Sequence, residues 1–144
     1  MKRVFVNEEW CLGCHLCEYN CAFANSGMKN MAKALKGKEI FPNIHVNGDD
    51  KINFAVSCRH CEDPLCVKAC ISGALHIEDG RVCIDKQRCV GCYSCIMICP
   101  YGSLSIGENG LASKCELCLN NSCSEPACVN GCPNRAIVYE ERRR

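Results

Sequence analysis

The sequence has few aromatic residues, no long apolar run and no excess of either charge. Phe, Tyr and Trp make up 6% of the 144 residues, a small supply for a conventional core. No stretch reaches the roughly 18 apolar residues that a membrane-spanning helix needs. Acidic residues follow Met1 too early for a signal peptide. Because 17 basic residues balance 16 acidic ones, we expect no nucleic-acid partner. The missing apolar run and signal peptide predict no direct membrane insertion and a cytoplasmic location.

Cysteine is abundant, with 18 residues, a level typical of chains built around cysteine chemistry. In the cytosol thiols stay reduced and bind metal, so we interpret these residues as metal ligands. Most of them fall into four groups, the last of which has one member too many, and Cys83 stands apart from all four. The groups are Cys11, Cys14, Cys17 and Cys21; Cys58, Cys61, Cys66 and Cys70; Cys89, Cys92, Cys95 and Cys99; and Cys115, Cys118, Cys123, Cys128 and Cys132.

The third group has the most specific spacing. Residues 89–100 follow the pattern C-x2-C-x2-C-x3-C-P, which is typical of bacterial iron–sulfur proteins. Three cysteines wrap one face of a [4Fe–4S] cluster, and in two-cluster proteins the fourth binds the neighbouring cluster. Gly91 allows backbone N–H groups to approach the sulfides. The alternative is a zinc-binding structural module, but zinc sites pair C-x2-C units across long loops.

Residue patterns predict short elements between the cysteine groups. We expect a helical turn over 18–23 and strands over 2–9, 74–77, 81–85, 103–106 and 136–139. An insertion over 28–57 should contain a helix and a hairpin. The helix is predicted over 28–38, with Ser26 as its cap, Met28, Met31, Ala32 and Leu35 on its apolar side and Gly37 at its end. The hairpin strands are predicted over 39–46 and 51–56, around a turn at 47–50.

Two stretches carry a specific resemblance. The second group, Cys58-Arg-His60-Cys61, and the fourth, from Pro126 to Pro133, resemble the four-cluster electron-transfer subunits of formate dehydrogenase and dimethyl sulfoxide reductase. The opening stretch over 7–24 resembles the iron–sulfur protein that works with nickel carbon monoxide dehydrogenase. The resemblance implies an α+β fold of two ferredoxin-like lobes, each holding two [4Fe–4S] clusters. The outer lobe would comprise 1–27 and 108–144, the inner lobe 58–107, with the insertion 28–57 between them.

The resemblance also implies how the cysteines are shared among four clusters, because the fourth cysteine of each group crosses to a neighbouring site. We number the sites by the group that supplies three ligands. The implied ligands are Cys11, Cys14, Cys17 and Cys132 at site 1; Cys58, Cys61, Cys66 and Cys99 at site 2; Cys89, Cys92, Cys95 and Cys70 at site 3; and Cys115, Cys118, Cys128 and Cys21 at site 4. The internal repeat of 61–70 in 123–132 supports a rival for site 4, in which Cys123 replaces Cys118.

These features predict an electron-transfer protein with no catalytic site. It would pass single electrons between a redox enzyme, carbon monoxide dehydrogenase in the favoured case, and a second acceptor protein. A subunit of a hydrogenase or formate dehydrogenase is the alternative, and a small enzyme that uses Cys83 or Cys123 is another. Cys83 otherwise suits a small buried residue on a strand. His60 and, with less support, His15 could donate a hydrogen bond to a cluster sulfur.

Overall fold

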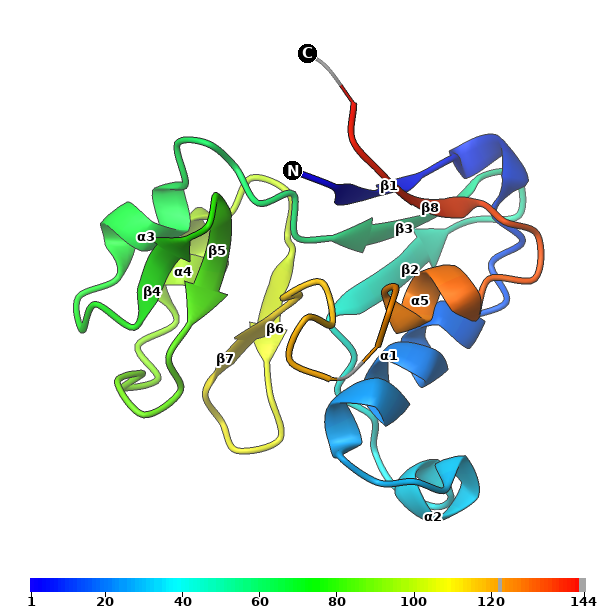
Figure 1. The fold of residues 1–144 in the computed structure, drawn as a ribbon, viewed down its shortest axis with the longest axis horizontal. Coiled ribbons are helices and arrows are strands. Elements are labelled where there is room, and N and C mark those ends of the chain that lie inside the picture. The colour runs from blue at the N-terminus through cyan, green and yellow to red at the C-terminus, as the bar shows by residue number, and fades with distance from the viewer. Residues whose placement is uncertain (122, 143–144) are drawn as a thin grey trace.

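The computed structural model describes residues 1–121 and 123–142, and it confirms the α+β class (Figure 1). In the described residues all sheets are antiparallel pairs of short strands. Residues 122, 143 and 144, which belong to the expected outer lobe, lie outside the described residues. The strands are β1 (Arg3–Val6), β2 (Ile44–Gly48), β3 (Asn53–Ser57), β4 (Leu75–Glu78), β5 (Arg81–Ile84), β6 (Leu104–Ile106), β7 (Ala112–Lys114) and β8 (Ile137–Glu140). The helices are α1 (Leu16–Ser26), α2 (Met31–Leu35), α3 (Leu65–Ala69), α4 (Ser94–Ile98), α5 (Ala127–Asn130) and the 3-10 turn η1 (Glu8–Trp10).

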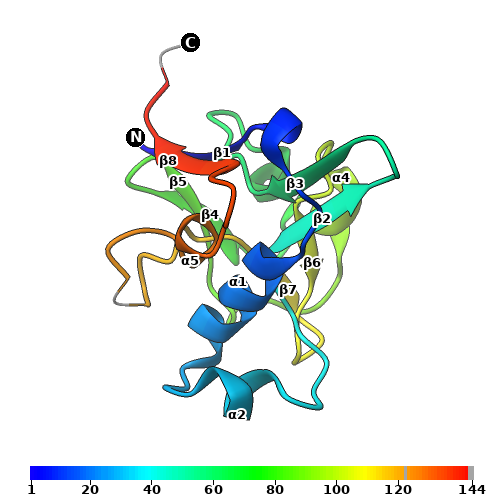
Figure 2. The same ribbon diagram turned by 90° about the vertical axis from the view of Figure 1, so that its right-hand side faces the viewer.

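Both ends of the chain meet in one sheet, as Figures 1 and 2 show. β1 pairs with β8 so that Val4 lies opposite Tyr139, which confirms the strands predicted over 2–9 and 136–139. Below this sheet α1 packs closely on α5. A Cβ added at Gly131 would come within 2.3 Å of the Asn20 side chain. The first and fourth cysteine groups are therefore neighbours in space.

The central part of the chain forms a second unit, in which α3 packs against α4. β4 pairs with β5 and β6 with β7, and the strands predicted over 74–77, 81–85 and 103–106 are confirmed. β7 was not predicted from the sequence. Its residues, Ala112–Lys114, include no β-branched or aromatic side chain, so the sequence carries little strand preference there.

The helix of the insertion is shorter than the sequence predicts. α2 covers Met31–Leu35 instead of 28–38, and its cap is Asn30, whose side chain accepts a hydrogen bond from the Lys33 N–H at 3.0 Å. The expected cap, Ser26, is the last residue of α1, which extends beyond the predicted turn at 18–23. The expected apolar side was also wrong, because Ala34 is buried whereas Met28 and Met31 are exposed.

The hairpin forms, but its turn lies two residues later than predicted. β2 and β3 pair from Ile44 opposite Ser57 to Gly48 opposite Asn53. The Asp49 carboxylate accepts hydrogen bonds from the Lys51 and Ile52 N–H groups at 2.8 and 2.9 Å. A carboxylate that bonds to the backbone two residues ahead makes an Asx turn. This local bond places the reversal at 49–52 instead of 47–50.

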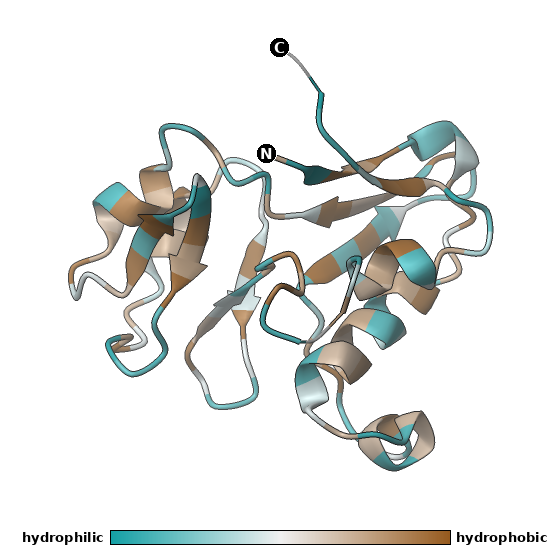
Figure 3. Cartoon of the chain, viewed as in Figure 1, coloured by the Kyte–Doolittle hydropathy of each residue, from teal (hydrophilic) through white to brown (hydrophobic). Residues whose placement is uncertain are grey.

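Cysteines supply much of the interior. One core combines Val4, Ile44, Ala55, Leu117 and Ile137 with the thiols of Cys17, Cys21, Cys58, Cys115 and Cys128. The second combines Leu75, Val82, Leu104 and Ala112 with Cys95, and Cys66, Cys70, Cys89 and Cys99 pack against it. In Figure 3 the hydrophobic residues concentrate on the paired strands and the connecting loops are largely hydrophilic. The thiols therefore lie where a chain with more aromatic residues would place apolar side chains.

Candidate metal centres

Left-handed backbone conformations curl the cysteine loops. Among the residues within the groups, Gly13, His60, Gly91 and Leu117 have φ values of +66°, +45°, +71° and +61°. A left-handed residue among right-handed ones turns successive N–H groups toward the same side of the loop. These N–H groups together form a concave surface that binds anions. Gly91, which the sequence analysis singled out, meets this requirement at no steric cost.

The four thiols expected at site 1 lie together. A small cavity beside β8 is lined by Leu12, Val46, Ala136 and Ile137 together with Cys11, Cys14, Cys17 and Cys132. Burial raises the pKa of Cys17 to about 12, and the neighbouring Glu18, Cys14 and Cys11 add to the rise. The Ala136 N–H donates a hydrogen bond to the Cys132 sulfur at 3.3 Å. Cys132, from the far end of the chain, thus completes the first group.

The thiols expected at site 3 also share a cavity. Leu75, Ile84 and Ala112 line it together with Cys70, Cys89, Cys92 and Cys95. The thiol of Cys92 is exposed, and hydrogen bonds from Ser94 lower its pKa. Burial raises the pKa of Cys70, but hydrogen bonds from Leu75 and Ser72 outweigh burial and leave it below its ordinary value. Burial raises the pKa of Cys95, so the thiols of this site differ in acidity.

The thiols expected at site 4 are the most deeply buried. Burial raises the pKa of Cys128, and the thiols of Cys115, Cys21 and Cys118 add to the rise. Burial also raises the pKa of Cys115 to about 12 and that of Cys21 to about 11. Cys21 receives hydrogen bonds from the Asn43 N–H at 3.3 Å and the Asn25 side chain at 3.5 Å. Such donors favour the thiolate that a metal requires.

Site 2 is expected to combine three cysteines of the second group with Cys99, the residue that ends α4. Burial and the neighbouring thiols of Cys58 and Cys99 raise the pKa of Cys66 to about 11, against the opposing charge of Lys114. The His60 N–H donates to the Cys58 sulfur at 3.4 Å. Cys61 lies in the same loop and is half-buried.

Neighbouring thiols place the four sites in a row. The thiol of Cys17, at site 1, contributes to the raised pKa of Cys128 at site 4. The thiol of Cys58, at site 2, likewise contributes to the raised pKa of Cys115 at site 4. Helix α3 carries Cys66 of site 2 and leads directly into Cys70 of site 3. These neighbours favour the order site 1, site 4, site 2, site 3 for the expected sites.

Two cysteines remain outside these sets. Cys83 lies on β5 and is 7% exposed, which confirms the expectation of a buried strand residue. Cys123 is close enough to Cys118 to raise the pKa of that thiol, after burial as the larger cause. Its own thiol donates to the Asn121 carbonyl at 3.4 Å. The histidine singled out in the first group, His15, contacts the Glu18 carboxylate at 2.8 Å.

The donor set fits an anionic, polynuclear group. In the described residues no three Cys, His, Asp or Glu side chains are positioned to hold a single metal ion. In a [4Fe–4S] cluster each thiolate binds its own iron, so the four thiols of a site do not meet at one point. Among residues 1–121 and 123–142, the buried Nε2 of His60 and Nη1 of Arg81 find no hydrogen-bond partner. Unpaired buried donors are costly, and the sulfurs of an adjacent cluster are suitable acceptors.

Lys114 is a buried charged residue that the sequence analysis missed. It directly precedes Cys115 on β7, and its side chain is 2% exposed. A lysine in a short polar segment indicates a surface position, so the sequence offers no signal for its burial.

No helix in the described residues is both long and apolar enough to cross a membrane.

Comparisons with known proteins agree with this donor set. The family described as "4Fe-4S dicluster domain" matches residues 50–142. An "Iron-sulfur protein" of Rhodospirillum rubrum is 36% identical over 93% of this chain and 79% of its own length. "Electron transport protein HydN" of Escherichia coli strain K12 is 31% identical, over 99% of this chain and 90% of its own. "Probable anaerobic dimethyl sulfoxide reductase chain YnfG" of the same strain is 33% identical, over 94% and 71%.

These matches favour iron–sulfur ligation over a zinc site. The dimethyl sulfoxide reductase chain also agrees with the resemblance seen in the second and fourth cysteine groups. The chain belongs to the 4Fe-4S dicluster domain family, and [4Fe–4S] clusters are its cofactors.

Proposed function

We propose that this chain is an iron–sulfur electron-transfer protein that passes single electrons through four clusters between a redox enzyme and a second acceptor protein. The observation that carries the proposal is the row of four thiol sets, each drawn from two segments far apart in sequence. When bound, a [4Fe–4S] cluster with four thiolate ligands exchanges one electron and leaves no open iron for a substrate. The chain's own groups position the thiolates, donate N–H hydrogen bonds to them and exclude water.

The proposed ligands are the sixteen cysteines named above for sites 1 to 4. Sites 1 and 4 would belong to the outer lobe, 1–27 and 108–144, and sites 2 and 3 to the inner lobe, 58–107, with 28–57 as the insertion. Cys118 is a proposed ligand of site 4. Its thiol helps to raise the pKa of the buried Cys128, as the thiols of Cys115 and Cys21 do. Cys123 would then be spare.

Electrons would enter and leave at the two ends of the row. Exposed apolar side chains flank the end sites: Leu12 is 62% exposed beside site 1, and Val90 and Met97 are 64% and 77% exposed beside site 3. Apolar side chains in contact with water, next to buried redox centres, suit transient docking of partner proteins. The middle sites 4 and 2 lie deeper and would relay electrons between the ends.

Carbon monoxide dehydrogenase is the favoured enzyme partner, on the basis of the sequence resemblance over 7–24. A hydrogenase and a formate dehydrogenase are the competing partners. None of the three is named by the relatives reported above, so the choice depends on direct measurement of electron transfer.

The test begins with iron and acid-labile sulfide in protein purified without oxygen, where about sixteen of each per chain are expected. The oxidised protein is then mixed with catalytic amounts of each candidate enzyme and its substrate: carbon monoxide, hydrogen or formate. Fast loss of the brown colour with carbon monoxide dehydrogenase alone supports the favoured partner. Reduction by another enzyme replaces the partner, and a colourless zinc-containing protein overturns the function.

A further inference from the structure

Lys114 is a buried cation at the junction between sites 2 and 4. Its ammonium donates hydrogen bonds to the carbonyls of Val82, on β5, and of Cys115, the latter at 2.6 Å. Among the ion pairs formed within residues 1–121 and 123–142, none includes Lys114. Two carbonyl dipoles therefore hold the ammonium, and no carboxylate of the described residues is in direct contact with it.

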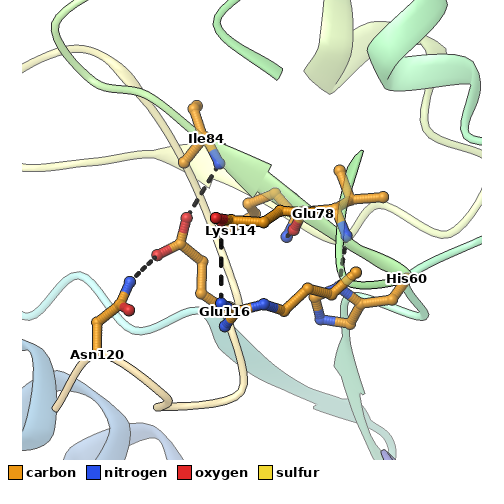
Figure 4. Close-up of polar contacts among 8 residues, drawn as sticks. His60, Glu78, Ile84, Lys114, Glu116 and Asn120 are labelled. Carbon is orange, nitrogen blue, oxygen red and sulfur yellow. Dashed lines mark hydrogen bonds and ion pairs between the residues drawn. The ribbon is translucent and has the colours of Figure 1, made fainter. Parts of the chain in front are cut away.

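The surroundings of Lys114 add more positive charge. His60 is completely buried, and its Nδ1 accepts a hydrogen bond from the Val82 N–H at 3.1 Å (Figure 4). Its proton must therefore be on Nε2, which has no acceptor. Burial, followed by the charges of Lys114, Arg3 and Arg81, lowers the pKa of His60 to about 3. Several cations thus converge on a neutral, unsatisfied imidazole.

Within the described residues, the nearby acidic groups form their contacts elsewhere and make no ion pair with Lys114. Glu116 binds the Ile84 N–H at 3.0 Å through one oxygen and the Asn120 side chain at 3.2 Å through the other. Arg81 has one carboxylate neighbour, Glu78, at 3.9 Å, and that carboxylate is 59% exposed. A buried cation without an anion is strongly unfavourable, so the fold requires a negative group beside Lys114.

Hydrogen bonds connect Lys114 to the cysteine loops of two sites. Its ammonium donates to the carbonyl of Cys115, expected at site 4, and to the carbonyl of Val82, whose N–H donates to His60 in the loop of site 2. A cluster with four thiolates is anionic, and one-electron reduction makes it more so. A nearby cation in a low-dielectric interior favours the reduced form, as it favours an ionised carboxylate.

We propose that Lys114 is a shared counter-charge for sites 2 and 4, which raises the reduction potentials of the two middle clusters relative to those at sites 1 and 3. This inference rests on the proposed function. It makes Lys114 a positioning and tuning residue that touches no partner protein. The middle clusters would hold an electron more tightly than the ends do.

The test is a redox titration of the cluster-loaded protein, monitored by electron paramagnetic resonance. The variants are K114M, which removes the charge, K114Q, which keeps a hydrogen-bond donor without charge, and K114R, which keeps the charge. K68M is the matched control, because Lys68 lies on α3 beside sites 2 and 3 but is 60% exposed.

In K114M and K114Q we expect two of the four clusters to bind an electron at least tenfold more weakly, a fall of about 59 mV each. K114R should stay near wild type, and K68M should change less than threefold because water screens its charge. Unchanged potentials in K114M and K114Q with full iron content overturn the proposal.

Loss of clusters is also decisive. If K114M and K114Q lose iron while K114R keeps all of it, the positive charge is required and the proposal stands. If K114R loses iron as well, Lys114 acts through packing and the proposal fails. A wild-type protein with fewer than about sixteen irons contradicts the four-cluster function, whereas insensitive potentials in a fully loaded protein contradict only the role of Lys114.

Discussion

The carboxylate of Glu116 accepts a hydrogen bond from the backbone N–H of Ile84 at 3.0 Å. The bond joins the loop of the fourth cysteine group to β5. The N–H of Val82, two residues earlier on the same strand, donates to His60, and its carbonyl accepts from Lys114. In a strand, residues i and i+2 point their backbone N–H and C=O groups toward the same side. The side chains of His60, Lys114 and Glu116 therefore cover the edge of β5 that does not pair with β4.

Replacing Glu116 with Ala should weaken this junction. The Ile84 N–H would lose its acceptor in a partly buried place, at a cost of about 1–3 kcal/mol in unfolding free energy. E116Q retains a carbonyl oxygen and should lose much less. Denaturant unfolding of the cluster-loaded protein and hydrogen exchange of the Ile84 amide measure the effect. Equal loss in E116A and E116Q would assign the role to the charge instead of the hydrogen bond.

Cross-ligation between the ends of the chain predicts which serine variants resemble one another. Cys21 lies with Cys128 and Cys115, whereas Cys17, on the same helix, lies with Cys14 and Cys11. C21S and C128S should therefore lose or alter the same paramagnetic signal, and C17S a different one. C83S is the control and should keep all signals. If C21S instead matched C17S, each group would hold its own cluster.

The spare cysteine of the fourth group gives a third prediction. C118S should lose about four irons per chain because it removes a proposed ligand of site 4, whereas C123S should keep its iron content and its rate of electron transfer. The thiol of Cys123 is close enough to Cys118 to raise its pKa. The two variants therefore remove thiols from the same part of the structure. The opposite result would establish the assignment suggested by the internal repeat of 61–70. A lost turnover in fully loaded C123S would favour the enzyme alternative.

The cysteine spacing gives a more specific prediction than the patterns of the elements between the groups. Ligand spacing is fixed by the size of the cluster, so C-x2-C-x2-C-x3-C can be recognised without a fold. By contrast, the limits of α2 and β2 depend on single side-chain bonds from Asn30 and Asp49, which several nearby polar residues could equally have made. Burial of Lys114 depends on β7 and β5 meeting across the chain, and no local pattern encodes that contact.

Acid should remove the clusters in an order set by thiol acidity. Protons compete with iron for each thiolate, and a thiol with a raised pKa is protonated at higher pH. Burial raises the pKa of every site 4 thiol, to about 12 for Cys115 from an ordinary 9.0. At site 3 burial raises the pKa of Cys95, but hydrogen bonds lower the pKa values of Cys70 and Cys92. As pH falls below about 9, site 4 should lose iron before site 3.

The measurement is the set of paramagnetic signals that remains after equilibration with an iron chelator at successive pH values. C128S, which lacks the most strongly perturbed thiol, identifies the signal of site 4, and C92S identifies that of site 3. Earlier loss at site 3 would mean that access of solvent to Cys92, which is exposed, outweighs the acidity of the thiols.

The two ends of the row should serve different partners. Leu12 lies in the first cysteine loop, Val90 lies in the third cysteine loop, and Met97 lies on α4. All three side chains are well exposed. Burying such a side chain in an interface is worth up to about 1.5–3 kcal/mol, so replacement with Gln should slow electron transfer about tenfold. We expect L12Q to slow exchange with one partner, and V90Q and M97Q with the other. Stopped-flow measurements with each partner in turn distinguish them, with iron content as the control for intact clusters. If all three variants slowed electron transfer with the same partner, that partner would contact both ends of the row. This result would contradict the prediction that each end serves a different partner.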